Sequence, residues 1–170
     1  KRALCDEDMK KVFTRLPSSS AIPLAVRRAQ DMFVLMFLLR GLPFVDLAYL
    51  RKSDLRDNVI TYRRRKTGRP LSVTLTPEAL ELLKKYMNRD SHSPYLFSLL
   101  KSGEGTKEAY REYQLALRSF NQQLTLLGEV LGLNDKLSSY TARHTWATTA
   151  YYCEIHPGII SEAMGHSSIK

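Results

Sequence analysis

The sequence predicts one domain, mainly α-helical, with a small antiparallel β-sheet or hairpin. Apolar residues recur at helical spacing, between capping and breaking residues, over most of the 170 positions. One stretch, residues 54–75, alternates instead and is interrupted by a turn. A chain of this length forms one domain by default and buries roughly 70% of its unfolded surface without a disulfide or metal.

Three helices are predicted in the first fifty residues. Asp6 caps the first helix, which a Pro-Ser-Ser-Ser run ends. Pro23 begins the second, and its last two turns are apolar all round, which is typical of a buried central helix. Gly41 ends this helix near residue 39, and Pro43 begins a short third helix over residues 44–50.

A β-hairpin with a basic tip follows. The alternation places Val59, Thr61 and Arg63 on one face of the first strand, and Ile60, Tyr62 and Arg64 on the other. The turn is Lys66-Thr-Gly-Arg, and residues 70–75 form the second strand.

The second half of the chain is predicted to be helical. Thr76, followed by proline and glutamate, begins a helix that ends near residue 88. Apolar steps of three and four over residues 107–131 fit a coiled coil or a core-facing helix, and the length favours the latter. Ser138 or Ser139 caps a helix to about residue 153, and Pro157 begins the last one.

Positive charge is concentrated in one segment. The chain has 26 Lys and Arg against 17 Asp and Glu, a formal charge of +9. Within residues 51–70, eight basic residues stand against two acidic ones: Arg51, Lys52, Arg56, Arg63, Arg64, Arg65, Lys66 and Arg69 are the basic set. Such a cluster is either a solvated hairpin that keeps the protein soluble or a surface for nucleic-acid phosphates.

Composition also excludes several classes of protein. Cys5 and Cys153 fit no disulfide framework and no metal spacing, so we expect a reducing, cytoplasmic location. The longest apolar run, residues 32–39, is too short to span a bilayer. The four histidines form no recognised metal-ligand set and no phosphate-binding glycine loop occurs, so we expect neither metal nor cofactor.

The residues able to do chemistry are cations and phenols. Tyr140 and Arg143 are three residues apart, hence neighbours on one helix face, with His144 adjacent. Taken singly, each candidate has an ordinary structural explanation. Arg143 fits a surface ion pair, Lys66 a solvated hairpin tip, and His166 a helix end after Gly165.

Four segments together resemble the catalytic domain of the tyrosine recombinases, or phage-type integrases. They are Phe44-Val-Asp-Leu-Ala-Tyr-Leu-Arg-Lys-Ser-Asp-Leu55, Arg65-Lys66-Thr-Gly-Arg-Pro, Tyr140-Thr-Ala-Arg143-His144-Thr-Trp-Ala, and Ile160-Ser-Glu-Ala-Met-Gly-His166-Ser-Ser. They follow the family's order and extend over nearly the whole chain. The resemblance implies the fold of that DNA breaking-rejoining domain over residues 1–170.

The resemblance also implies a reaction. A tyrosine hydroxyl attacks a DNA phosphodiester and forms a transient 3′-phosphotyrosyl bond, with no metal or high-energy cofactor. Arg143 corresponds to the second catalytic arginine, which holds non-bridging phosphate oxygens, and Lys66 to the general acid for the 5′-oxygen. His166 corresponds to a phosphate ligand or proton shuttle. The basic segment, with Arg51, Lys52, Arg63, Arg64, Arg65 and Arg69, is expected to contact double-stranded DNA.

Two residues depart from the family pattern within the site. Pro43 stands where the first catalytic arginine is expected, and Arg40, one turn earlier, either replaces that guanidinium or ends the helix. Tyr140 replaces a histidine; a phenol can bind phosphate but titrates near ~10 and is a poor base at neutral pH. These two features together resemble the integrases of conjugative and mobilisable transposons of gut bacteria, and His144, adjacent to Arg143, is a further candidate for the site.

The nucleophile is expected beyond Lys170, because Tyr151 and Tyr152 precede the His166 segment and fit packing positions. We also expect the family's DNA-clasping N-terminal domain outside this chain. By resemblance, we expect the partners to be double-stranded DNA and other protomers in a synaptic tetramer, with no membrane involved. The isolated domain is expected to be a monomer, and the location to be bacterial, cytoplasmic and nucleoid-associated.

Three interpretations therefore stand. The first is the catalytic domain of a site-specific recombinase. The second is a DNA-binding module that keeps the recombinase fold without its chemistry, as Pro43 and Tyr140 allow. The third is an unrelated cationic protein that binds RNA, and it predicts wide separation of Arg40, Lys66, Arg143 and His166 in the fold.

Overall fold

The computed structural model describes residues 3–14, 16 and 21–152, with side chains through residue 150. The elements are α1 (Asp6–Val12), α2 (Leu24–Leu38), α3 (Phe44–Tyr49), a 3-10 helix η1 (Lys52–Asp54), β1 (Leu55–Arg56), β2 (Val59–Arg63), β3 (Pro70–Thr74), α4 (Pro77–Tyr86), α5 (Lys107–Leu131) and α6 (Thr141–Tyr152). A mainly helical domain with a small antiparallel sheet is confirmed. The predicted helix from Pro157 lies outside the described residues.

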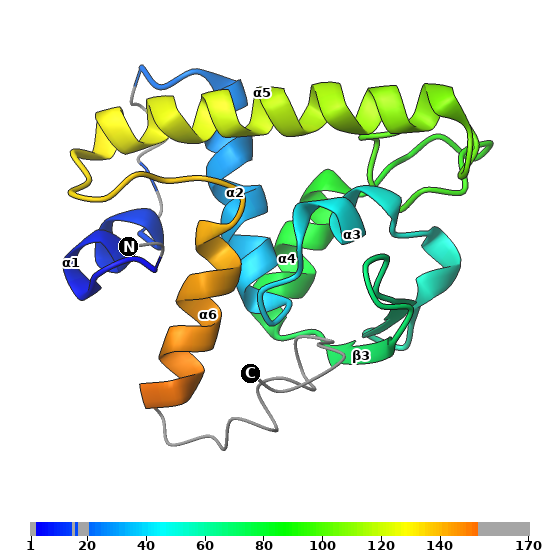
Figure 1. Cartoon of the computed structure of the whole chain (residues 1–170), viewed down its shortest axis with the longest axis horizontal. Coiled ribbons are helices and arrows are strands. Elements are labelled where there is room, and N and C mark those ends of the chain that lie inside the picture. The colour runs from blue at the N-terminus through cyan, green and yellow to red at the C-terminus, as the bar shows by residue number, and fades with distance from the viewer. Residues whose placement is uncertain (1–2, 15, 17–20, 153–170) are drawn as a thin grey trace.

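Helix α2 is the centre of the core. It packs against α4, α5 and α6, and Phe33, Leu35 and Met36 are completely buried. Figure 1 shows α5 running along the upper edge of the molecule, with α2, α4 and α6 extending below it in a different direction. The apolar last turns of α2 are buried because neighbouring helices cover them on several sides, as the all-round pattern predicted.

Helix α5 faces the core with one stripe. Phe120, Leu124 and Leu127 are buried, while Leu115 and Leu126 on its outer side are largely exposed. Leu124 and Leu127 belong to the same core cluster as α2, so the stripe packs within the domain. Within the described residues, α5 is therefore a core-facing helix and not part of a coiled coil.

The sheet has one strand more than the predicted hairpin. Its order is β1-β2-β3, antiparallel throughout, with Ile60 opposite Val73 and Leu55 opposite Ile60. Residues 54–64 do not form one strand, because Asp57 and Asn58 adopt left-handed φ values of 52° and 63° and turn the chain. Asp and Asn tolerate this conformation, which suits a tight hairpin.

Threonine hydroxyls cap the N-termini of helices α4 and α5. The Oγ1 atoms of Thr76 and Thr106 accept hydrogen bonds from the backbone N–H of Ala79 and Ala109, at 3.2 and 3.1 Å. The predicted cap of α1 is wrong by one residue, because Cys5 is the N-cap and Asp6 lies in the first turn. No described helix combines the length and the apolar character needed to cross a membrane.

Candidate functional site

Arg143 is a buried arginine on α6. Only 7% of its surface is exposed, and its Nη1 donates a hydrogen bond to the backbone oxygen of Gly41 at 2.9 Å. Gly41 directly follows the end of α2, so this bond joins α6 to the α2–α3 connection. The bond helps to hold a guanidinium, which carries five donors, in the interior.

Gly41 makes the close approach of α6 possible. Its φ is +71°, in the left-handed region, and a Cβ at this position would lie 3.0 Å from the Cα of Arg143. It would also lie 3.3 Å from the Cβ of Trp146. Only a residue without a side chain combines this backbone conformation with this contact.

A carboxylate and a second arginine lie beside Arg143. Asp46 on α3 is 3% exposed, and its Oδ1 accepts a hydrogen bond from the backbone N–H of Arg65 at 3.0 Å. Burial raises the pKa of Asp46 above its usual value, whereas the N–H of Arg65 and the charges of Arg64 and Arg143 act in the opposite direction. Arg64 is itself buried, at 8% exposure.

The electrostatics of Arg143 reflect these neighbours. Burial, and next the positive charge of Arg64, lower the pKa of Arg143 to about 10, against the opposing effects of Tyr62 and Asp46. Burial also raises the pKa of Tyr62, and the negative charge of Asp46 raises it further. Arg143 stays positively charged at neutral pH. We define the group Asp46, Tyr62, Arg64 and Arg143 as the arginine cluster.

Lys66 lies at the tip of the β2–β3 hairpin and is exposed. Two backbone bonds shape this turn: Arg64 N–H donates to the oxygen of Arg69 at 2.9 Å, and Gly68 N–H donates to the oxygen of Arg64 at 2.6 Å. Gly68 takes a φ of +73°. The hairpin therefore places one buried cation, Arg64, and one exposed cation, Lys66, two residues apart.

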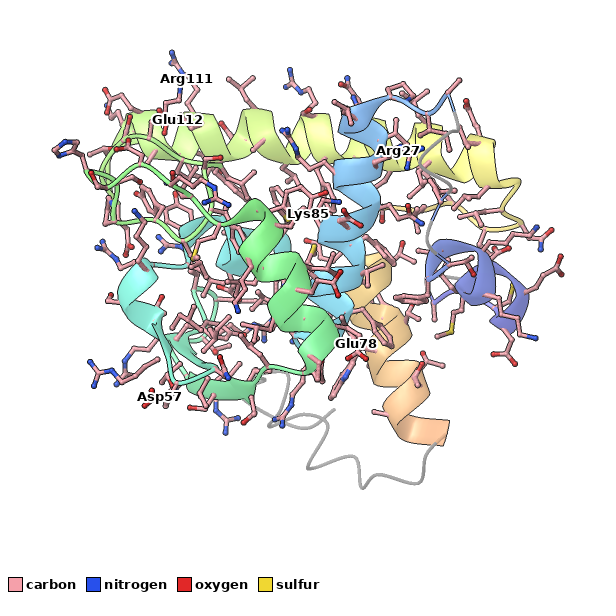
Figure 2. The ribbon with its side chains drawn as sticks, turned by 180° about the vertical axis from the view of Figure 1, so that it is seen from behind. Arg27, Asp57, Glu78, Lys85, Arg111 and Glu112 are labelled. Carbon is pink, nitrogen blue, oxygen red and sulfur yellow. The ribbon has the colours of Figure 1, made fainter. Side chains whose placement is uncertain are left out.

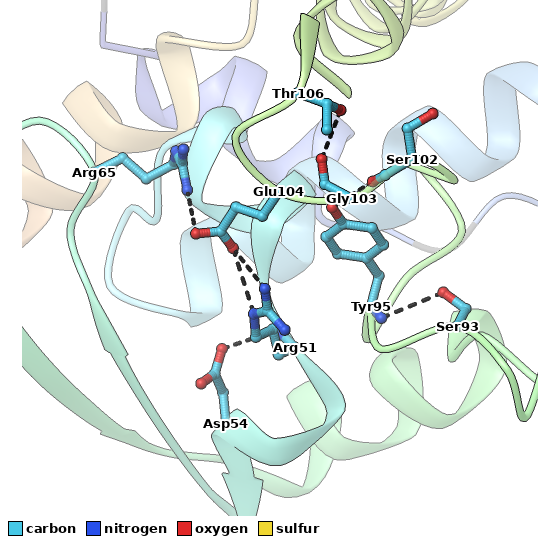
Figure 3. A network of polar contacts seen from close by, with 9 residues as sticks. All are labelled: Arg51, Asp54, Arg65, Ser93, Tyr95, Ser102, Gly103, Glu104 and Thr106. Carbon is cyan, nitrogen blue, oxygen red and sulfur yellow. Dashed lines mark hydrogen bonds and ion pairs between the residues drawn. The ribbon is translucent and has the colours of Figure 1, made fainter. Parts of the chain in front are cut away.

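Glu104, in the loop before α5, holds two further cations of the basic segment. Its Oε1 accepts hydrogen bonds from Nε and Nη2 of Arg51 at 3.3 and 3.2 Å, and its Oε2 lies 3.4 Å from Nη1 of Arg65 (Figure 3). The Arg65 guanidinium also lies over the Tyr49 ring, 3.7 Å from its centre. Glu104 therefore links the start of η1 to the hairpin.

The remaining cations of the basic segment lie at its surface. Lys52 Nζ donates to the backbone oxygen of Asp90, and Arg63 Nη1 donates to the backbone oxygen of Gly68 at 3.0 Å. Arg63 is exposed, and Lys52 and Arg69 are half-buried. Their DNA contacts stay a prediction. Arg64 differs from all of them because it points into the protein.

Arg40 ends α2. Its φ is +61°, its backbone N–H donates to the oxygen of Phe37 at 3.1 Å, and the residue is exposed. Tyr140, just before α6, is 67% exposed, and its ring centre lies 6.5 Å from that of the half-buried His144. His166 lies outside the described residues. The catalytic roles of these residues stay predictions.

The sequence reasoning did not find three residues of this region: Gly41, Asp46 and Glu104. The local pattern identified Gly41 only as a helix breaker. Its left-handed backbone and its contact with α6 could not be predicted from neighbouring residues. A signal did exist for Arg64, because the strand alternation places it with Ile60 and Tyr62, which are 1% and 9% exposed.

Among the described residues, one group of side chains has metal-like spacing, and it is structural. Ligand atoms of Cys5, Asp8 and Asp135 lie within 4.8 Å of one another. The Asp8 carboxylate, however, accepts hydrogen bonds from the backbone N–H of Asn134 at 3.1 Å and of Asp135 at 3.0 Å. These bonds fasten α1 to the loop after α5.

Residues 8–170 match the model of the phage integrase family. The chain belongs to the phage integrase family. This membership confirms the resemblance on which the site was assigned, and the third interpretation, an unrelated RNA-binding protein, is wrong. The buried Arg143 and the exposed Lys66 accordingly lie in a tyrosine recombinase catalytic domain.

Individual phage integrase and recombinase relatives agree with this assignment. The chain is 26% identical over 173 residues to the tyrosine recombinase XerA of Pyrococcus furiosus. This match covers 99% of the chain and 54% of that protein. A crystal structure of XerA recombinase shares the fold at a TM-score of 0.64 and 18% identity, over 99% of this chain and 57% of that one.

The Tn1549 transposon integrase in complex with transposon right end DNA has a TM-score of 0.66 at 15% identity. That match covers 98% of this chain and 58% of the integrase. The chain therefore spans little more than half the length of these relatives. At these identities the solved structures establish the fold of the domain.

Proposed function

We propose that this domain catalyses site-specific DNA strand cleavage and rejoining as part of a longer recombinase. The observation that best supports the proposal is the buried guanidinium of Arg143, which is hydrogen-bonded to Gly41 and feels the charge of Arg64, on the hairpin that bears Lys66. The basic segment supplies the electrostatic attraction for double-stranded DNA, through Arg51, Lys52, Arg63, Arg65 and Arg69.

The reaction follows from these groups. A tyrosine hydroxyl, which the family resemblance assigns to a position after Lys170, forms a bond to phosphorus while the bond from phosphorus to the 5′-oxygen breaks. Lys66 gives its proton to that leaving oxygen, and Arg143 holds the non-bridging oxygens on which charge accumulates. His166 binds the phosphate or transfers a proton. The phosphotyrosyl bond conserves the energy for rejoining.

The position of Arg143 suits this role physically. A guanidinium that is already desolvated interacts more strongly with a developing negative charge than one that must first lose water. Its hydrogen bond to Gly41 fixes the orientation of the guanidinium plane before any phosphate binds. Lys66, in contrast, is exposed, as a group that meets DNA must be.

The test is formation of a covalent protein–DNA adduct by the full-length protein on a nicked duplex that traps the cleaved strand. We expect adduct from the wild type and none from Arg143→Ala. Arg111→Ala is the matched control, because Arg111 is an exposed arginine on α5 that projects away from the body, on the opposite side from Asp57 of the β1–β2 turn (Figure 2).

The outcomes separate the interpretations. Normal adduct from Arg143→Ala would contradict the role of this residue. DNA binding by the wild type with no adduct would instead support the second interpretation, a module that keeps the fold without the chemistry. Assembly with other protomers is tested by the mass of the complex on DNA, where we expect a tetramer on two paired sites and a monomer for the isolated domain.

A further inference from the structure

Arg64 is a buried cation within a basic segment whose other members reach the surface. It directly follows β2 and continues its alternation, on the face of Ile60 and Tyr62. Its backbone is fixed on both sides of the turn by the bonds to Arg69 and Gly68. The side chain therefore enters the interior from the hairpin, with 8% of the residue exposed.

In the interior, the Arg64 side chain lies near Asp46 and Arg143. The next residue, Arg65, donates its N–H to Asp46, so the hairpin lies directly against α3. Arg64 is the charged group with the largest effect on Arg143, and it also acts on Asp46. The charged groups of the arginine cluster are thus two guanidiniums and one carboxylate.

This grouping has a chemical meaning. Two like charges in a desolvated place repel each other, and the repulsion is relieved when an anion lies between them. A phosphodiester is such an anion, and two planar forks match its two non-bridging oxygens. The carboxylate of Asp46 is one negative charge that acts on both cations.

Arg40 fits this place less well. It is exposed, its backbone takes the left-handed turn that ends α2, and its N–H is bonded within that turn. Such a position explains the residue as the end of a helix. Pro43, where the family pattern has an arginine, leaves the second guanidinium to come from another element.

We propose that Arg64 supplies the second guanidinium that holds the scissile phosphate, in place of an arginine at position 43. This inference rests on the proposed cleavage activity. Arg64 and Arg143 stay protonated throughout and each contacts a non-bridging oxygen. The bond from tyrosine to phosphorus forms, the bond to the 5′-oxygen breaks, and the proton on that oxygen comes from Lys66.

The test compares two substrates of the full-length protein. One has a normal scissile phosphate, and the other a methylphosphonate, in which a methyl group replaces one non-bridging oxygen and the linkage is uncharged. On the phosphate, we expect Arg64→Ala to form adduct about 10²–10³-fold more slowly than the wild type. On the methylphosphonate, we expect most of this difference between variant and wild type to disappear. Arg111→Ala, remote from the cluster, changes neither rate.

The ratio of the two rates is the readout, because a merely structural defect slows both substrates alike. A normal rate for Arg64→Ala on the phosphate, or an equal loss on both substrates, overturns the inference. A rescue by methylphosphonate in Arg40→Ala but not in Arg64→Ala assigns the second guanidinium to Arg40. If thermal unfolding shows that Arg64→Ala does not fold, Arg64→Lys and Arg64→Gln are judged by the same ratio.

The proposed function fails separately from this inference. Absence of adduct from the wild type on either substrate overturns the cleavage activity itself. If the wild type forms adduct and the Arg64 variants have the same ratio of rates on the two substrates as the wild type, only the assignment of Arg64 is overturned.

Discussion

Replacing Gly41 by alanine tests how the α2–α3 connection positions α6. The left-handed φ of +71° costs an L-residue about 1–2 kcal/mol. The new methyl group would also lie 3.0 Å from the Cα of Arg143 and 3.3 Å from its backbone oxygen. Forcing an extra methyl into such a contact costs about 1–3 kcal/mol, so the expected loss of unfolding free energy is about 2–5 kcal/mol.

The assay is urea unfolding of Gly41→Ala beside Gly132→Ala. Gly132, which ends α5, has a similar φ of +65°, but a Cβ there would meet nothing within 4 Å. The control therefore loses only the backbone contribution, and the difference between the variants measures the contact with α6. Equal destabilisation of the two would refute the reasoning. Because a shift of Arg143 by about 1 Å can slow catalysis by about 10²-fold, we also expect weaker adduct formation from Gly41→Ala.

Three further predictions concern stability, each measured by urea unfolding. Glu104→Gln removes two surface ion pairs and lowers the unfolding free energy by about 0.4–2 kcal/mol, an effect that about 1 M NaCl removes; persistence in salt contradicts it. Burial opposes ionisation of Asp8, but backbone hydrogen bonds, that of Asn134 first, hold its pKa below its ordinary 3.8. Its carboxylate therefore stabilises the fold above that pH, and the advantage of wild type over Asp8→Asn should fall as pH drops through the folded pKa; a constant difference sinks this account. Phe44→Ala removes a buried ring stacked on Phe120 at 4.7 Å and should cost about 3–5 kcal/mol, against less than ~1.5 for Phe44→Leu; similar losses contradict the packing argument.

Local patterns in the chain were sufficient for the elements. The threonine cap of α4, the bounds and apolar stripe of α5, the apolar all-round turns of α2 and the alternation of β2 all appear in the structure at or near the predicted residues. Capping and periodicity act between residues a few positions apart, so they can be read from a short window. The turn at Asp57 and Asn58 was missed because the alternation continues across it.

The site was predicted only in part, for a related reason. Motif order identified Arg143 and Lys66, and the family match supports the domain to which they belong. The partners of Arg143 come from far along the chain, since Gly41 is 102 residues away. The hydrogen bond between them leaves no mark in the motif, and the strand alternation gave a signal for the burial of Arg64 but not for its proximity to Arg143.

The sequence by itself determined the class of fold, the concentration of positive charge in residues 51–70 and the family of the domain. Only the tertiary structure decided which of those cations are surface groups and which one turns inward to meet Arg143. The physical reason is that charge is a property of composition, whereas desolvation and electrostatic coupling depend on which distant segments pack together. For this chain that packing buries Arg64 near Arg143 and leaves Arg40 exposed just beyond α2.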